Sequence, residues 1–479
     1  MQADGDDAWF ARWRSTELAR LDATGVTYLD YTGAALYPES LVRRDANRLV
    51  DAVLGNPHSE SAPSRAATAG LESAREAILA FVNADPAEYA VVLTANATAA
   101  CRLVAEAFRF GPTTPLVLAA DNHNSVNGIR EFAQRAGSPV AVVPLDPELR
   151  MVDPVGALAR QQGESSGLFA FPAQSNFSGV RHPLELVQAA QALGYRTLLD
   201  AASFAATSIV DLSRVRPDFV ALSIYKIAGY PTGIGALVAR RDALAELRRP
   251  WFSGGTVEWV TVASGRHRLR DTVEAFEDGT PPFLAAGAVR SALASVVYAD
   301  RERLARHLHG LTAQLIDGLL GLRHADDASL VTIHGPADNV DRGATVAVTL
   351  RDRRGVVIPY WQVEDAARNA GIALRGGCFC NPGCAEHAFG LQEAGPCLDA
   401  LGDRFTIPRL AACLGGRPVG AIRISFGLGS IAADVRRVLA FVAEYADQDI
   451  SVECSTSAVP SRPSFSPPTG RSLSPACDS

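Results

Sequence analysis

One stretch of the chain decides the fold: Leu222-Ser223-Ile224-Tyr225-Lys226-Ile227-Ala228-Gly229-Tyr230-Pro231-Thr232-Gly233. An apolar run over residues 219–224 leads to Lys226, and the glycines and proline that follow predict a loop after a strand. Burial at a strand end disfavours the ammonium form of a lysine, lowers its pKa and makes the amine a nucleophile towards an aldehyde. A lysine in such a place more often keeps its amine in water. The functional interpretation of Lys226 therefore depends on the residues that accompany it.

Length and charge limit the function classes. The chain has 479 residues, a hydrophobic fraction of 48% and a net charge of −7. Its charges form no long runs, which argues against binding to nucleic acid or to a membrane surface and favours a small-molecule partner. An acidic N-terminus and the absence of an 18-residue apolar run predict a cytoplasmic protein. Eight cysteines are then not expected to form a disulfide framework.

Strands and helices alternate through the first half of the chain. Apolar strands are predicted at residues 90–93, 115–120, 140–145, 167–171, 197–199, 219–224 and 235–239. Strands that are apolar on nearly every residue and separated by helices are typical of an α/β fold with a mostly parallel sheet, here seven-stranded, covered on both faces. Ligands of such sheets bind beyond the carboxyl ends of the strands. Polar residues follow the predicted strands there, namely Asn96, Thr98, Asp121, His123, Gln174, Asn176, Asp200, Ser203, Ser223 and Lys226.

The second half of the chain predicts a smaller α+β domain. A long helical stretch from Leu284 leads to a strand at 345–350, a helix at 362–369, a strand at 422–426 and a final helix from Ile431. From about residue 451 the chain is rich in serine, proline and threonine, which predicts disorder. We therefore expect four parts, an N-terminal segment that packs with the small domain, a large α/β domain, a small α+β domain and a disordered tail, with bounds at 1–45, 46–285, 286–448 and 449–479.

The strand-end residues together supply what a pyridoxal phosphate enzyme needs. Lys226 would hold the cofactor aldehyde as a Schiff base, and Asp200 would keep the pyridinium nitrogen protonated, which makes the ring an electron sink. His123 would stack on the ring, while Thr98 and Ser223 would bind the phosphate at a helix N-terminus. Taken singly, His123 is a loop histidine, Asp200 a cap and Thr98 part of an ordinary N-cap. Their occurrence in this order on successive strands favours the cofactor site.

Five stretches also carry a family resemblance. They are residues 121–126, 172–179, 225–233, 276–280 and 375–383, and the resemblance extends over residues 28–445. The chain resembles the class V aminotransferase group of fold-type I pyridoxal phosphate enzymes, and within it the N-terminal cysteine desulfurase-like domain of the molybdenum cofactor sulfurases. The resemblance implies a homodimer whose cofactor lies near the subunit interface.

The resemblance also implies further cofactor contacts. Thr256 would reach the phosphate of the neighbouring subunit, and Asn176 would lie beside the ring hydroxyl. Ala97 and Ser203 complete the expected cofactor-binding set. Ser203 stands where many class V members have glutamine, and Tyr225 stands where many have histidine; both departures accompany the sulfurase branch.

A cysteine-rich loop gains a role from this resemblance. In cysteine desulfurases a loop thiolate attacks the sulfur of L-cysteine, alanine leaves and a persulfide stays on the enzyme. Cys380 matches that nucleophile by its distance from Arg375, and Arg423 matches the arginine that binds the substrate carboxylate bidentately. Such a thiol is expected as a thiolate, on a mobile loop, near positive charge. Cys378 and Cys384 would assist or resolve the persulfide.

Other interpretations remain open. Cys378, Cys380, Cys384 and His387 would form a zinc site, although one intervening residue is tighter than the usual ligand spacing. The cysteines would alternatively be buried small hydrophobes, against which the neighbouring Asn-Pro-Gly turn argues. The same scaffold would also suit a C–S lyase or an aminotransferase for another amino substrate, or a non-catalytic sulfur-relay subunit. Because a full sulfurase carries a second domain and this chain ends in the predicted tail, we expect the sulfur acceptor to be another protein or a small molecule.

Overall fold

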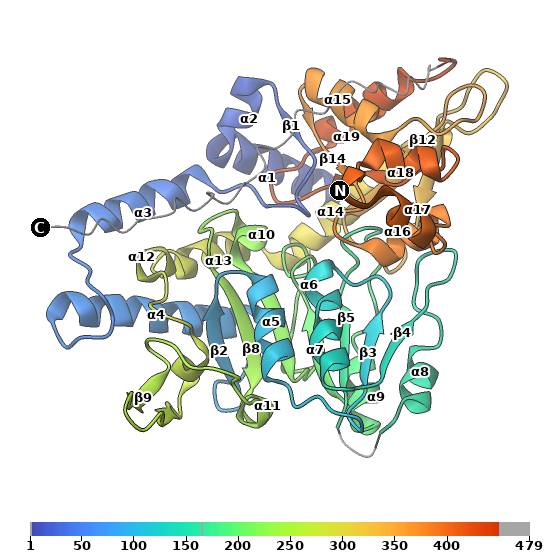
Figure 1. Cartoon of the computed structure of the whole chain (residues 1–479). Helices are drawn as coiled ribbons and strands as arrows, with labels where there is room; N and C mark the ends of the chain where they lie inside the picture. Colours follow the sequence, from blue (N-terminus) through green and yellow to red (C-terminus); the bar gives the residue numbers. More distant parts are fainter. Residues whose placement is uncertain (1, 164–165, 450–479) are drawn as a thin grey trace, which may run out of the picture.

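The computed structural model describes residues 2–163 and 166–449 (Figure 1). The tail predicted to be disordered lies outside these residues from residue 450 on. A large layered unit with a central sheet occupies one half of the molecule, and a smaller unit with a second sheet sits on it (Figure 1). The proposed bounds between the parts of the chain, at residues 45, 285 and 448, stay a prediction.

The central sheet has seven strands in the order β2-β8-β7-β6-β5-β3-β4. β8 runs antiparallel to both of its neighbours, and every other neighbouring pair is parallel. The predicted mostly parallel, seven-stranded sheet is thus confirmed. Its strands are β2 (Tyr89–Thr94), β3 (Leu116–Ala119), β4 (Val140–Val143), β5 (Leu168–Pro172), β6 (Arg196–Asp200), β7 (Phe219–Ser223) and β8 (Gly235–Arg240).

Both faces of this sheet are buried, which explains why its strands are apolar on nearly every residue. In β7, Val220 and Leu222 pack into one hydrophobic cluster while Phe219 and Ala221 pack into another. Helices cover each face (Figure 1). One face carries α5 (Ala97–Ala107) and α7 (Ile129–Arg135), and the other carries α4 (Ala62–Phe81), α9 (Leu186–Ala192) and α13 (Val289–Tyr298).

The second sheet is antiparallel and has the order β11-β12-β15-β14. Its strands are β11 (Val331–His334), β12 (Thr345–Leu350), β14 (Arg375–Gly377) and β15 (Ala421–Ser425). Helices α14 (Arg301–Gly321), α15 (Tyr360–Asn369) and α19 (Ala432–Ala443) accompany it. The sequence predicted β12, β15, α15 and α19 but not the two outer strands. A short parallel pair of β1 (Thr27–Tyr28) and β13 (Ile372–Ala373) ties the N-terminal segment to this half.

The long helical stretch expected from Leu284 consists of three helices. It comprises α12 (Phe283–Ala286), α13 and α14, and Asp300 caps α14 by accepting from the backbone N–H groups of Glu302 and Arg303. Among the described residues no single helix is long and apolar enough to cross a membrane; only Phe283–Tyr298 and Arg301–Gly321, bent by 62°, meet that criterion together.

The remaining elements are α1 (Gln2–Glu17), α2 (Ala19–Thr24), α3 (Glu39–Asp51), α6 (Asn124–Asn127), α8 (Pro154–Arg160), α10 (Ile224–Ala228), α11 (Arg241–Glu246), β9 (Val257–Val260), β10 (His267–Leu269), α16 (Pro382–Phe389), α17 (Gly395–Leu401) and α18 (Ile407–Cys413), with 3-10 turns at Val273–Phe276 and Gly402–Arg404.

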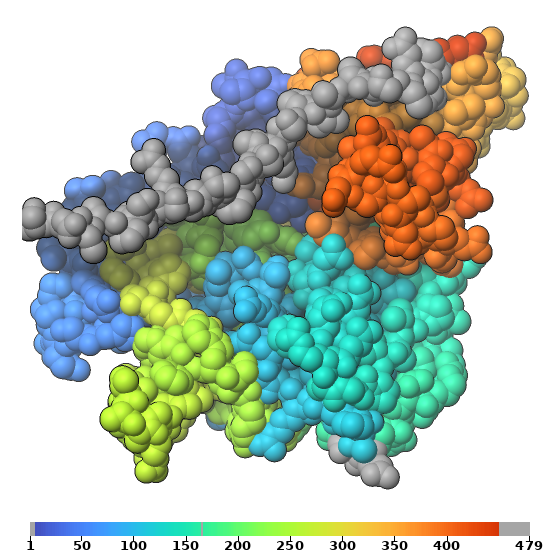
Figure 2. Space-filling model, viewed as in Figure 1, coloured from blue at the N-terminus to red at the C-terminus, as the bar shows by residue number. Residues whose placement is uncertain are grey.

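The C-terminal half lies directly against the large unit beside the α5–α7 face. Figure 2 shows the orange segment that holds α16 to α18 seated on the blue-green segment that holds α6 and α7. The contact is close at Gly383, where a Cβ atom would lie 1.9 Å from the carbonyl oxygen of Ala120. Glycine at this position therefore lets α16 approach the carboxyl end of β3.

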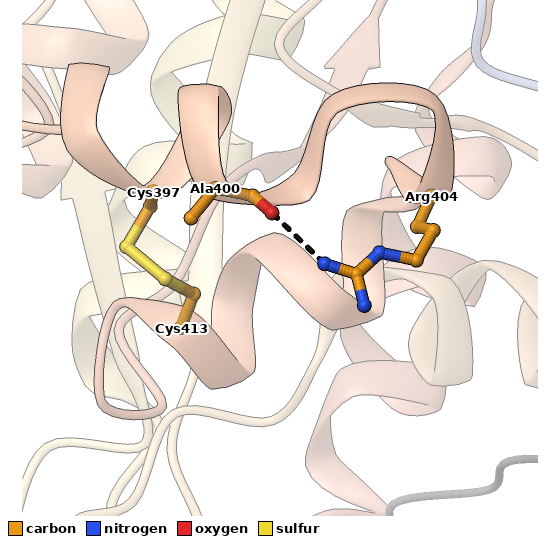
Figure 3. The surroundings of a disulfide bond; sticks show 4 residues. All are labelled: Cys397, Ala400, Arg404 and Cys413. Carbon is orange, nitrogen blue, oxygen red and sulfur yellow. Dashed lines mark hydrogen bonds between the residues drawn. A yellow bond between two sulfur atoms is a disulfide. The ribbon is translucent and has the colours of Figure 1, made fainter.

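One disulfide occurs among the described cysteines, and the sequence did not predict it. Cys397 and Cys413 join α17 to α18 with a Cα–Cα distance of 5.9 Å (Figure 3). The Arg404 guanidinium donates to the carbonyl oxygen of Ala400 across the same turn, at 3.1 Å (Figure 3). Because the disulfide links two neighbouring short helices, it holds together only the segment from α17 to α18 and does not cross-link the rest of the fold.

A close backbone approach at Gly235 leads to a prediction. Gly235 begins β8 opposite Ser223, and a Cβ atom there would lie 2.4 Å from the carbonyl carbon of Asn96 and 2.7 Å from the carbonyl oxygen of Leu222. Because both neighbours are backbone atoms, Gly235→Ala should lower the free energy of unfolding by about 1–3 kcal/mol. Urea unfolding measures this change.

A matched substitution of the same kind provides the control. Gly310, in the middle of α14, has nothing within 4 Å of the position its Cβ would take. Gly310→Ala should therefore stabilise the protein by up to about 1 kcal/mol, the helix-propensity gain. Equal stabilities of the two variants would contradict the steric argument.

Candidate active site

A pocket lies at the carboxyl ends of the parallel strands, where the sequence predicts the ligand. It encloses about 600 Å³, part of which is open to solvent. Its lining includes the predicted residues Ala97, Thr98, His123, Asn176, Asp200, Ser203, Ser223 and Lys226. The predicted residues Thr256, Arg375, Cys380 and Arg423 are not among those that line it.

Lys226 lies in α10, a single helical turn that follows β7 directly. The sequence predicted a loop here; the chain instead makes one turn that ends at Gly229, whose φ of 75° is in the left-handed region that favours glycine. Burial is the largest effect on the Lys226 amine and lowers its pKa. Arg423 and Arg375 lower this pKa further, while Asp200 raises it. The amine therefore sheds its proton more easily than an ordinary lysine does.

Lys226 is also the only lysine of the chain. The sequence holds 45 lysines and arginines, of which the other 44 are arginines. Apart from the N-terminal amino group, the chain has one primary amine, and it is buried in this pocket. This count is a signal for the site that our sequence analysis missed.

The N-terminus of α5 forms a cradle of hydroxyl and N–H groups. The Ala97 N–H donates to the Ser223 hydroxyl at 2.9 Å, and the Asn96 side chain caps the helix by accepting from the Ala99 N–H at 3.0 Å. The hydroxyls of Thr98 and Ser125 lie 2.7 Å apart. The hydroxyls of Thr98, Ser125 and Ser223 and the positive end of the helix dipole make this place suited to an anion. Sequence reasoning missed Ser125, two residues after His123.

His123 caps a short helix and also lines the pocket. Its Nδ1 accepts from the Ser125 N–H at 3.1 Å, so His123 caps α6, while its ring also lines the pocket. Burial lowers the pKa of the imidazole, and Lys226 lowers it further. A neutral ring is therefore favoured at neutral pH. Asp200 raises this pKa, as it raises that of Lys226, which indicates that the carboxylate lies close to both.

The residues of the pocket fit pyridoxal phosphate by their chemistry. Lys226 offers a buried amine for the aldehyde, and Asp200 offers a carboxylate, with one oxygen held by the Ala202 N–H at 3.0 Å. The α5 cradle offers donors for a phosphate, and His123 offers a flat ring. Among the residues described, no three His, Cys, Asp or Glu side chains come together as metal ligands.

The predicted nucleophile loop, residues 378–381, connects β14 to α16 and is firmly held. Three consecutive carbonyl oxygens of the loop accept hydrogen bonds of 2.7–2.9 Å. The Cys378 oxygen accepts from the Asn381 N–H within the loop. The Phe379 oxygen accepts from the Asn176 side chain, and the Cys380 oxygen accepts from the Asn124 N–H. Phe379 and Cys380 both have a φ of 56°, a conformation that L side chains adopt only when their surroundings enforce it. Hydrogen bonds thus join this loop to its neighbours, and its expected mobility stays a prediction.

Asn381 fastens this loop to the large unit. Its side-chain amide donates to the Asp121 carbonyl oxygen at 2.7 Å and to the Asn176 side-chain oxygen at 3.0 Å, and its own oxygen accepts from the Cys384 N–H. Asn381 is 0% exposed. Sequence reasoning read the Asn-Pro-Gly sequence as a turn and missed this role.

The three loop cysteines differ in their surroundings. Cys378 and Cys380 are exposed, whereas Cys384 is buried, with its sulfur 3.6 Å from the Ser175 hydroxyl. Burial raises the pKa of the Cys384 thiol, so Cys384 behaves as a buried small hydrophobe. The side chains of the alternative zinc site do not come together as a ligand group within the described ranges: Cys384 is buried, whereas Cys378 and Cys380 are exposed. A Cys380 thiolate raises the pKa of Lys226, so the sulfur acts on the pocket.

Two arginines and one aspartate lie beside the nucleophile loop. Arg375 on β14 pairs directly opposite Arg423 on β15, and the Asp30 carboxylate accepts from both, at 2.6 Å and 2.7 Å. Arg423 also donates to the Asn176 carbonyl oxygen at 3.0 Å and stacks over the Phe379 ring. Sequence reasoning found both arginines but missed Asp30, which lies more than 340 residues from either.

Thr256 lies outside this pocket in its own chain. It is buried in the loop before β9, where its hydroxyl donates to the Ser253 carbonyl oxygen at 2.8 Å and accepts from the Ser253 N–H at 2.9 Å. Its expected contact with the phosphate of a neighbouring subunit stays a prediction.

The role of Asn381 can be tested directly. Asn381→Ala removes the donor of two buried oxygens and the acceptor of the Cys384 N–H, so the free energy of unfolding should fall by at least about 2 kcal/mol. The loosened loop should also let iodoacetamide alkylate Cys380 faster, as followed by peptide mass spectrometry. Asn124→Ala is the control, since Asn124 holds the loop through its backbone N–H alone. Unchanged stability and alkylation would refute the fastening role.

An aromatic cluster beneath the loop makes stability depend on pH. Phe379 packs on Phe177, and His334 meets Phe389 edge to face with ring centroids 4.9 Å apart. Burial lowers the pKa of His334 to about 4 from 6.5. Between pH 6.5 and about pH 4, His334 is protonated in the unfolded chain but stays neutral in the folded chain. Stability from this group is therefore complete above pH 6.5 and is lost as the pH falls towards 4, by up to about 3 kcal/mol.

Denaturant unfolding at pH 7 and pH 5 measures this loss. His334→Gln, which cannot take up the proton, should flatten the pH dependence. His309→Gln, at an exposed position of α14, should leave it as in the wild type. The same pH dependence in all three proteins would exclude His334 as its source.

Comparisons with known proteins show which family and which fold this chain is similar to. The family described as Aminotransferase class-V matches residues 27–438. Curated relatives include the molybdenum cofactor sulfurases of Drosophila mojavensis, 36% identical over 88% of this chain, and of Solanum lycopersicum, 34% identical over 90%. The chain spans 58% and 56% of the lengths of these relatives.

Solved structures share the fold. A cysteine desulfurase from Thermococcus onnurineus superposes with a TM-score of 0.73 at 23% identity, and covers 90% of this chain and 97% of its own. The cysteine desulfurase CsdA from Escherichia coli gives a TM-score of 0.71 at 23% identity, with coverages of 91% and 98%. The cystine C–S lyase C-DES gives 0.67 at 18% identity, with coverages of 88% and 98%. The predicted fold is confirmed, and the match over residues 27–438 establishes that this chain belongs to the class-V aminotransferase family.

Proposed function

We propose that this chain is a pyridoxal phosphate-dependent cysteine desulfurase, which converts L-cysteine to alanine and keeps the sulfur as a persulfide on Cys380. The observation that carries the proposal is the position of Cys380: it lies on a held loop, beside the Arg375–Arg423 pair, and its thiolate acts on the Lys226 amine. The names of the curated relatives and of the solved structures support the same reaction class.

The residues that line the pocket would hold the cofactor and move the proton at the α-carbon of the substrate. When bound, pyridoxal phosphate supplies an electron sink next to the α-carbon of the substrate. Asp200 keeps the ring nitrogen protonated, and the hydroxyls at the start of α5 hold the phosphate. The lowered pKa of Lys226 lets this amine take up and return a proton at the substrate α-carbon.

Two groups of the C-terminal half act on the substrate itself. Arg423, assisted by Arg375, binds the substrate carboxylate through its planar fork of donors. The Cys380 thiolate attacks the substrate sulfur, so that a sulfur–sulfur bond forms as the carbon–sulfur bond breaks. A proton replaces sulfur on the β-carbon, and alanine leaves.

Two further proposals concern the oligomeric state of the protein and the molecule that accepts the sulfur. We propose a homodimer, because Thr256 lies outside the pocket of its own chain and would complete that of a neighbour. The acceptor of the sulfur is proposed to be a separate protein or a small molecule. A cytoplasmic location stays a prediction from the sequence.

A product assay tests the reaction. Purified protein with pyridoxal phosphate, L-cysteine and a thiol reductant should release alanine and sulfide in equal amounts. Pyruvate with ammonia would instead identify a C–S lyase, the activity named for the structural neighbour C-DES, and would overturn the proposal.

Two cysteine variants test the nucleophile. Cys380→Ser should abolish alanine formation from L-cysteine, because serine offers no thiolate, whereas Cys378→Ser, exposed on the same loop, should leave the rate little changed. Borohydride trapping should attach the cofactor to Lys226, the only lysine, equally in both variants and so prove an intact site. Undiminished alanine formation by Cys380→Ser would exclude Cys380 as the nucleophile.

A further inference from the structure

The carboxylate of Asp30 lies between the two guanidinium groups of the substrate-binding pair. Its oxygens accept from Arg375 at 2.6–3.1 Å and from Arg423 at 2.7 Å. Asp30 follows β1 and pairs with Ser425 of β15, so its backbone is held beside both arginines. The neighbouring Gly33 leaves room for the pair, because a Cβ atom there would lie 2.5 Å from Asp30 Oδ2 and 2.7 Å from an Arg375 nitrogen.

The two arginines need a negative partner. Arg375 and Arg423 are directly opposite each other across an antiparallel pair, where like charges repel. Arg423 is buried, which raises the cost of an unpaired charge. Asp30 therefore neutralises one of the two guanidinium charges within the protein.

The pair nevertheless keeps donors for a ligand. The Nε of Arg423 is buried and lacks a hydrogen-bond partner within the part of the chain that is described. The side chain of Arg375 is 49% exposed. Each guanidinium has five N–H groups, of which Asp30 uses only some. Both arginines also lower the pKa of Lys226, so they act at the pocket in which the amine lies.

The charges on these three side chains sum to one positive charge, from two guanidinium groups and one carboxylate. One substrate carboxylate balances that charge. A second acidic group on the substrate would add a negative charge that these three side chains leave unbalanced. We propose that Asp30 determines specificity: by neutralising one guanidinium, it restricts the site to amino acids with one negatively charged group and disfavours those with two. This inference rests on the proposed function, in that the ligand of the pair is an amino acid substrate.

Binding of L-alanine and L-aspartate to the holoprotein tests the inference without sulfur transfer. Their apparent dissociation constants are measured from the change in cofactor absorbance. The wild type should prefer L-alanine, and Asp30→Asn should shift the ratio of the two constants at least tenfold towards L-aspartate. Asp30→Glu keeps the charge and should retain the wild-type ratio. Because neither ligand carries sulfur, a failed desulfuration assay would leave this result interpretable.

Charge-restoring variants separate specificity from a structural role. Asp30→Asn with Arg375→Gln again leaves one positive charge and should restore the preference for L-alanine. If Asp30→Asn alone does not fold, Arg375→Gln still tests the inference, since it leaves no net charge and should widen the preference for L-alanine. An unchanged ratio in folded, cofactor-loaded Asp30→Asn or in Arg375→Gln would overturn the proposal, as would a double variant that keeps the altered ratio.

Discussion

The burial of the Lys226 amine is the constraint on which the rest of the site depends. A lysine in water is charged at neutral pH and is a poor nucleophile. Burial is the largest effect that lowers the pKa of the Lys226 amine, and Arg423 and Arg375 lower it further. The sheet provides these surroundings, because β7 is buried along its length and α10 turns the chain back immediately after it. Gly235 and Gly229 let neighbouring backbone pack closely around this turn, where any side chain would collide.

A second constraint is that the site is assembled from both ends of the chain. The large unit supplies Asp200 at the end of β6 and Lys226 in α10. Arg375 and Arg423 come from the second sheet, Cys380 comes from the loop after β14, and Asp30 comes from the N-terminal segment. Side-chain amides and carboxylates join these parts: Asn381 and Asn176 connect the nucleophile loop to the large unit, and Asp30 connects the N-terminal segment to β14 and β15. The loop that carries Cys380, the proposed nucleophile, is therefore positioned by hydrogen bonds that cross the boundary between the two halves.

Local signals made much of this predictable. The strands of the central sheet were readable because they are buried on both faces and thus apolar throughout, and the polar residues that follow them identified most of the pocket. β11 and β14 were missed because their side chains are only partly buried and carry no clear period. Asp30 and Asn381 were missed because their partners are far apart in sequence, so that no local pattern reports them. Ser125 and the break at Asp300 depend on cap hydrogen bonds that require the folded geometry. One signal needed no structure and was still overlooked: Lys226 is the only lysine of the chain, since the other 44 of its 45 lysines and arginines are arginines.

The charges around Lys226 also couple the base to the nucleophile. Arg375 and Arg423 lower the pKa of the amine, while a Cys380 thiolate raises it. The amine is therefore a stronger base when Cys380 is deprotonated and a weaker one when the sulfur carries a proton. In the proposed reaction, removal of the α-proton by Lys226 is thus favoured in the same charge state in which Cys380 would attack the substrate sulfur. Asp30 contributes to this balance, because without its carboxylate two uncompensated guanidinium groups would act on the amine and weaken it as a base. The Asp30 carboxylate, which we propose to restrict the charge of the substrate, therefore also helps to keep Lys226, the proposed base, able to accept a proton while Cys380, the proposed nucleophile, is a thiolate.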